Sequence, residues 1–196
     1  KTLRHHDHEV RKIMSTDTVK PFLGFVLRVT VLHTVTYWLF GLVFGVFLFN
    51  YHYWFSVPPL SLYMKPTTSI WVAAGPLFQL IRGPIMALVL YPFRNVFLGR
   101  KYGWIYLWGL FFGLAILNCP GPAPGSIEGM VYTVIPVWLQ IAFLPETVLQ
   151  TLAFSFLIHL WQNRPDNKKL LILFLILFIV ILAFSILGVL FGGGTP

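Results

Sequence analysis

Long apolar runs alternate with short polar segments along this chain, and their lengths predict membrane crossings. Residues 21–49, 70–93 and 170–191 contain few charged side chains. About 20 apolar residues suffice to span a bilayer as a helix, so each of these runs is long enough. Residues 102–118 form a shorter run of the same kind. The pattern predicts an all-α fold, a polytopic integral membrane helical bundle.

Residues 130–162 are either one very long crossing or two short ones. Pro136 and Pro145 lie inside the run, and a proline removes a backbone hydrogen bond of a helix. One long, tilted crossing gives five transmembrane segments in total, which we expect. The alternatives are six crossings, or a re-entrant segment at residues 120–140 followed by a true crossing at 145–162.

Two polar segments interrupt the runs with distinct compositions. Residues 50–69 crowd tyrosine, tryptophan and phenylalanine around Pro58-Pro59. Aromatic side chains gather where membrane meets water, so this segment predicts an interfacial loop or a short helix in the membrane plane. Residues 119–129 contain three prolines and three glycines and predict a loop.

Composition supports a lipid environment. Of the 196 residues, 57% are hydrophobic and only 10% are charged, whereas soluble domains have about 25% charged residues. The net charge of +8 would suggest nucleic acid in a soluble protein. Here the basic residues flank apolar runs, so we expect contacts with membrane lipids and no nucleic acid.

The basic residues also predict an orientation. Lys and Arg are frequent in residues 1–20, 94–101 and 163–169, and nearly absent from residues 50–69 and 119–129. Because cytoplasmic loops are enriched in Lys and Arg, this alternation places the N-terminus in the cytoplasm. We expect an integral membrane protein of a bacterial inner or plasma membrane.

The domain organisation that follows is simple. Residues 1–20 predict a polar cytoplasmic tail, and residues 21–192 predict a single transmembrane helical domain. The chain starts with Lys1 rather than Met, and residues 1–20 do not have the pattern of a cleavable signal peptide. We therefore interpret the chain as processed or as part of a longer one.

Ionisable residues lie near the middle of three runs and are the main candidates for function. His33, Arg82 and Glu146 each fall at the centre of an apolar run. A charge at the bilayer centre costs at least about 2.5–3.5 kcal/mol, so such residues face the protein interior and find partners. We expect Arg82 to pair with Glu146. Supporting hydrogen bonds would come from nearby amides: Gln79, Gln140 and Gln150.

Two sets of residues recur at four-residue spacing, which places each set on one face of a helix. Polar side chains recur at four-residue steps after Glu146, and this stripe is either a polar path or an interhelical hydrogen-bonding face: Thr147, Thr151, Ser155 and His159. Small or amide residues recur at the same spacing in the second run, and such stripes allow helices to approach closely: Gly75, Gln79, Gly83 and Ala87.

The leading hypothesis is a small transporter-like or channel-like module with a polar intramembrane site. Arg82 would hold an anionic group, and Glu146 would exchange a proton or cation. A second hypothesis is a structural or accessory subunit that binds other membrane subunits or a second copy of itself. A third is a membrane enzyme acting on lipid through Cys119 or His159. No residue is assigned as catalytic, no cofactor is indicated, and the histidine cluster at residues 4–9 is not expected to be a metal site.

Overall fold

The computed structural model describes residues 16–117 and 121–192 and confirms the all-α class. These residues form helices and irregular connections, with no strand among them. Four helices are long and apolar enough to cross a membrane: Pro21–Leu48, Gly75–Phe97, Val137–Gln162 and Lys168–Phe191. A shorter apolar helix, Gly103–Leu117, corresponds to the short run predicted at residues 102–118.

The elements follow one another with short connections. In chain order they are α2 (Thr16–Leu42), the π-helical η1 (Val43–Leu48), α3 (Tyr51–Trp54), η2 (Leu60–Leu62), α4 (Ile70–Ala73), α5 (Gly75–Leu90), η3 (Tyr91–Phe93), α6 (Arg94–Phe97), α7 (Gly103–Phe112), the π-helical η4 (Gly113–Leu117), α8 (Ile127–Tyr132), α9 (Val137–Gln162) and α10 (Lys168–Phe191).

One helix, not two, accounts for most of residues 130–162. The extended backbone of Pro136 precedes the first residue of α9, so the chain breaks there. Pro145 lies inside α9 without ending it. The preceding residues form the separate short helix α8, which begins at a serine N-cap, Ser126, whose hydroxyl accepts from the Gly129 N–H.

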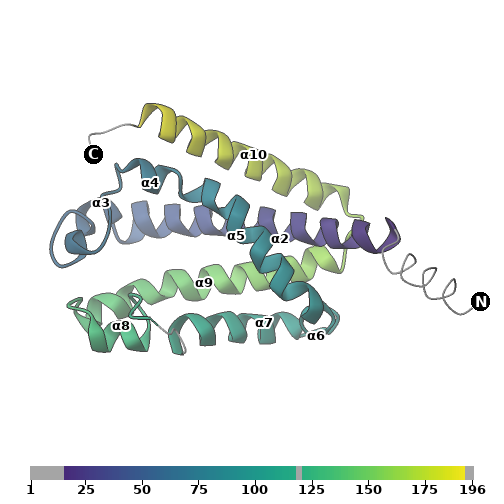
Figure 1. The fold of residues 1–196 in the computed structure, drawn as a ribbon, viewed down its shortest axis with the longest axis horizontal. Coiled ribbons are helices and arrows are strands. Elements are labelled where there is room, and N and C mark those ends of the chain that lie inside the picture. The colour runs from purple at the N-terminus through teal and green to yellow at the C-terminus, as the bar shows by residue number, and fades with distance from the viewer. Residues whose placement is uncertain (1–15, 118–120, 193–196) are drawn as a thin grey trace, which may run out of the picture.

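Helix α2 is the central element of the molecule. It contacts α5, α9 and α10, while α7 packs on the outer side of α9 (Figure 1). The middle of α2 carries the core: Phe25, Val29 and Leu32 are fully buried, and all of residues 29–36 are buried. The core side chains from other helices surround this part, namely Leu107, Phe154, Ile158, Trp161, Phe174 and Ile181. The end of α2, from Tyr37 onward, is less enclosed.

The predicted stripe of α5 is confirmed as a packing face. Gly75, Gln79, Gly83 and Ala87 are all buried. At Gly83 the two backbones nearly touch, because a Cβ added there would lie 2.6 Å from the Cα of Thr30 on α2. By contrast, a Cβ added at Gly109 would meet nothing within 4 Å.

The two ends of the molecule differ in charge. Helix α2 starts at the same end as α6 and the connection between α9 and α10, whereas α3, α4, α8 and the end of α10 lie at the opposite end (Figure 1). The first end carries most of the basic residues: Arg94, Arg100, Lys101, Arg164, Lys168 and Lys169. The segment between α3 and α4 contributes only Lys65.

The Gly83 contact predicts a sharp difference between two alanine substitutions. Gly83→Ala forces α2 and α5 apart and should destabilise the protein by about 1–3 kcal/mol, the usual cost of overpacking a tight contact. Gly109→Ala is the matched control, since its Cβ enters open space. Thermal unfolding midpoints in one detergent would measure both. Equal midpoints for the two variants would contradict the close contact.

Candidate functional site

An open cavity of about 960 Å³ lies at the end of the molecule opposite the start of α2. It is bounded by the second half of α2, the segment from α3 to α4, the first half of α5 and the first half of α9. Its volume is at the upper end of the range for small-molecule sites, roughly 300–1,000 Å³. The cavity therefore has room for an organic ligand.

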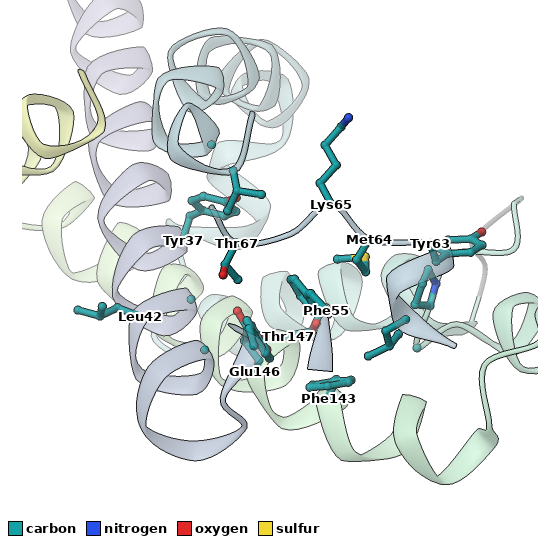
Figure 2. A pocket seen from close by; sticks show the side chains of 18 of the residues that line it. Tyr37, Leu42, Phe55, Tyr63, Met64, Lys65, Thr67, Phe143, Glu146 and Thr147 are labelled. Atoms are coloured by element: carbon teal, nitrogen blue, oxygen red, sulfur yellow. The ribbon is translucent and has the colours of Figure 1, made fainter. Parts of the chain in front are cut away.

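Aromatic and aliphatic side chains form most of the cavity wall. Figure 2 shows Phe55 and Phe143 on one side, with Tyr37 and Thr67 across from them and Glu146 close by. The aromatic lining residues are Tyr37, Trp38, Tyr51, Phe55, Tyr63, Trp71, Phe78 and Phe143. The polar and charged ones are His52, Lys65, Thr67, Gln79, Gln140, Glu146 and Thr147. An apolar wall with a few converging polar groups is typical of ligand sites.

A tight reversal of the chain brings Tyr51 to Glu146. Helix α2 ends in the π-helical turn η1, and Asn50 then adopts a left-handed backbone with φ of 48°. Asparagine tolerates that conformation because its short side chain hydrogen bonds locally, and here its side chain accepts from the Tyr53 N–H. The reversed chain lays the Tyr51 ring over Gly45, where an added Cβ would be only 2.8 Å from the ring.

The Tyr51 hydroxyl donates a hydrogen bond to Oε2 of Glu146. Burial raises the pKa of this hydroxyl, so it remains a neutral donor. The Tyr51 ring stacks on Phe55 at a centroid distance of 4.9 Å and meets the edge of Phe143 at 5.4 Å. One carboxylate oxygen is thus held by a tyrosine that is itself fixed by two rings.

The other carboxylate oxygen of Glu146 is open to the cavity. No residue in the described ranges hydrogen bonds to Oε1 or pairs with the carboxylate as a counter-ion. Gly41 lies opposite, and a Cβ added there would be 3.9 Å from Oε1. The absence of a side chain at Gly41 leaves this oxygen accessible.

Gln79 places a second polar group at the cavity. Its side chain is only 3% exposed, and its Nε2 donates to the Gly75 carbonyl at 3.0 Å. Its Oε1 is buried and has no partner among the described residues. The His33 side chain lies beside this oxygen, so the donor that a buried acceptor requires is available within the protein.

Arg82 does not meet Glu146, contrary to the pairing that their similar depth suggests. Its side chain is exposed and lies outside the cavity lining. The reason is rotational: Gly83 faces α2, and one residue turns a helix by about 100°, so Arg82 leaves that face. The two side chains therefore do not form an ion pair.

Three further residues predicted for the site, His33, Gln150 and His159, do not line the cavity. His33 is buried in the core edge-on to Phe154, at 5.8 Å, and does not line the cavity. Gln150 is half-buried, with no hydrogen bond in the described part of the chain. His159 contacts Asn163 at the far end of α9, away from Glu146. None of the three lines the cavity, although His33 lies beside the lining residue Gln79.

The polar stripe of α9 does not form a continuous path from the cavity, and its Thr151 hydroxyl bonds within the helix itself. The Thr151 hydroxyl donates to the Thr147 carbonyl one turn earlier, at 2.7 Å. Ser155 is fully buried and its hydroxyl has no partner among residues 16–117 and 121–192. Only Thr147 reaches the cavity. The stripe thus runs from the cavity into the packed half of the molecule.

Gln140 organises the loop at the cavity rim. Its Oε1 accepts from the Gly125 N–H at 3.0 Å, and its Nε2 faces three acceptors: the carbonyls of Gly129 and Ile135 and the hydroxyl of Thr133. One side chain therefore ties residues 125–135 to α9. The sequence indicated Gln140 only by its depth, and it indicated Tyr51 only as an interfacial aromatic residue.

Two candidates from the sequence lie outside the described residues. They are Cys119 and the histidine cluster at residues 4–9. Within the described ranges, no group of three or more His, Cys, Asp and Glu side chains could hold a metal ion. The cavity around Glu146 is therefore the arrangement that the structure offers for function.

Removal of the Gln140 amide should release the rim loop. Gln140→Leu removes the acceptor of the Gly125 N–H and the amide donor to the Ile135 carbonyl, at a cost of about 1–3 kcal/mol. Hydrogen–deuterium exchange would show faster exchange across residues 125–135. Gln150→Leu is the matched control on the same helix and should leave that exchange unchanged. Unaltered protection in Gln140→Leu would refute this role.

Comparison with known proteins gives no function for the cavity around Glu146. No family model matches the chain, and neither a curated protein nor a solved structure matches it. The function is accordingly argued from the cavity and from the groups that line it.

Proposed function

We propose that this chain is an integral membrane protein that binds an amphipathic small molecule in the cavity and acts as a small transporter-like module. The observation that carries the proposal is the accessible carboxylate of Glu146 in a largely aromatic cavity. An apolar wall binds the body of a ligand, and a few polar groups orient it. Glu146 is the residue that we expect to contact the polar group of the ligand.

The distribution of packing favours a transporter-like module over a channel. The cavity opens at one end, while the other half of the molecule is filled by core side chains such as Leu32, Phe154 and Ile158. A channel needs a continuous polar path, whereas alternating access needs a site that opens to one side at a time. The open cavity above a packed half is compatible with the second arrangement.

The proposed topology has five crossings with the start of α2 in the cytoplasm of a bacterial inner or plasma membrane. The four long helices and the shorter α7–η4 segment would each cross once. This topology is supported by the basic residues at the end where α2 starts, since cytoplasmic loops are enriched in Lys and Arg.

Single cysteines would test the topology. In a Cys119→Ser background, Lys65→Cys should react with a membrane-impermeant maleimide on intact cells. Lys101→Cys and Lys168→Cys should react only after permeabilisation. Labelling of Lys168→Cys on intact cells would instead require an odd number of crossings between Lys101 and Lys168, as in the six-crossing alternative.

Arg82 favours a second candidate function, an accessory subunit of a larger membrane complex. Its charged side chain is exposed at the middle of a long apolar helix, with no hydrogen-bond partner in the described part of the chain. An arginine facing lipid is costly, and a carboxylate on a partner helix would remove that cost. In this case Arg82 would bind another chain rather than the ligand.

Native mass spectrometry after gentle extraction separates the two candidates. The transporter-like reading predicts a single species or a homo-oligomer with a bound small molecule. That molecule should be lost in Glu146→Gln and retained in Glu128→Gln, which removes an acid at the same end but outside the cavity lining. A larger assembly with other polypeptides, dissociated by Arg82→Leu, would support the accessory subunit instead.

A further inference from the structure

The cavity contains a carboxylate that forms no ion pair with a described residue of the chain. Two basic side chains, His52 and Lys65, line the cavity. His52 contacts the Thr67 hydroxyl at 2.9 Å through Nδ1. Lys65 is exposed and points away from the cavity (Figure 2), and its Nζ lies 6.0 Å from the centroid of the Trp71 ring. A partly buried carboxylate is costly without a counter-ion, so the missing positive charge points to the ligand.

Aromatic rings lie on the same side of the cavity as Glu146. Phe143 lies three residues earlier on α9 and therefore shares a helix face with Glu146. Tyr51 and Phe55 stack against each other with an interplanar angle of 12°, and Tyr51 touches both Phe143 and the carboxylate. Ring faces attract cations within about 6 Å, and quaternary ammonium groups are bound in such aromatic surroundings.

The second polar group of the cavity is also an acceptor. Gln79 has its Nε2 committed to the Gly75 carbonyl, and its Oε1 is a buried acceptor beside His33 rather than a group open to the cavity. Oε1 of Glu146 is the acceptor that faces the cavity. An open carboxylate oxygen favours a cationic or donor-rich ligand and disfavours an anion.

The size of the cavity and its small number of oxygen ligands favour an organic cation over a metal ion. A hard cation such as Ca²⁺ takes 6–8 oxygen ligands, whereas Glu146 is the one carboxylate among the lining residues. The cavity of about 960 Å³ is far larger than such an ion and mostly apolar in its lining. An amine or quaternary ammonium ion with an apolar body fits both properties.

We infer that the cavity binds an organic cation with an apolar body, with its charged group against Glu146 and the rings of Tyr51, Phe55 and Phe143. This inference rests on the proposed function and names its substrate class. It assigns Glu146 as the residue that discriminates charge and the aromatic wall as the part that binds the body of the ligand.

The test compares two ligands of the same shape. The probes are 4-phenylbutyl-trimethylammonium and its uncharged isostere, in which a carbon replaces the nitrogen. Calorimetric titration into nanodiscs of a zwitterionic lipid, with empty nanodiscs as the blank, gives both affinities. We expect the purified protein to bind the cation at least about tenfold more tightly, because cation–π and charge contacts together exceed the 1.4 kcal/mol that a factor of ten represents.

Three variants test whether Glu146 causes the preference for the cation over its isostere. Glu146→Gln keeps the shape of the side chain and should abolish the preference while the isostere still binds. Glu128→Gln should keep the preference. Gly41→Leu should weaken both ligands, since a side chain there extends toward Oε1 of Glu146. Thermal unfolding of each variant confirms that it is folded.

The outcomes separate the inference from the proposed function. Equal binding of both ligands, or tighter binding of the isostere, would overturn the cation class while leaving a ligand-binding cavity. A preference that persists in Glu146→Gln would also overturn the inference, because the charge contact would lie elsewhere. Failure of both ligands to bind, with no molecule copurifying, would overturn the proposed function as well.

Discussion

The contact between Thr30 and Gly83 determines how the rest of the molecule is arranged. Because Gly83 has no side chain, α2 and α5 approach until their backbones nearly touch. The two helices cross at this region and diverge on either side of it (Figure 1). On one side, Phe25, Val29 and their neighbours fill the space as a core. On the other side, the same divergence leaves the cavity next to Gly41, Gly75 and Gln79.

The cavity places a polar group where folding alone would not favour one. A partly buried carboxylate that has one hydrogen-bond donor and no counter-ion among residues 16–117 and 121–192 is unfavourable for stability, whereas a leucine of similar size would pack well. Natural proteins deviate from good local packing mainly at functional sites. The hydrogen bond from Tyr51 and the stacked ring of Phe55 hold Glu146 in place without neutralising it. A carboxylate that is held in place but not neutralised differs from an ordinary polar contact between packed helices, in which the polar groups satisfy one another.

Arg82 and Glu146 show why similar positions within two apolar runs are insufficient to pair two charges. Counting residues along each apolar run gives a position along the helix axis and nothing about rotation. Arg82 is next to Gly83 in the sequence, yet the 3.6-residue period of the helix turns it away from the contact with α2. Glu146 instead faces the cavity, where Tyr51 arrives from a reversal in the chain that no periodic pattern encodes.

The sequence by itself determined the all-α class, the approximate bounds of the long helices, the packing face of α5 and the separation of an end rich in Lys and Arg from an end poor in them. These features depend on local periodicity, on composition and on the length needed to cross a bilayer. The break at Pro136 rather than Pro145, the reversal at Asn50, the loop held by Gln140 and the cavity beside Glu146 were decided only by the tertiary structure. Each of these depends on which helix faces meet, and rotation about a helix axis is set by side chains that are distant in the sequence.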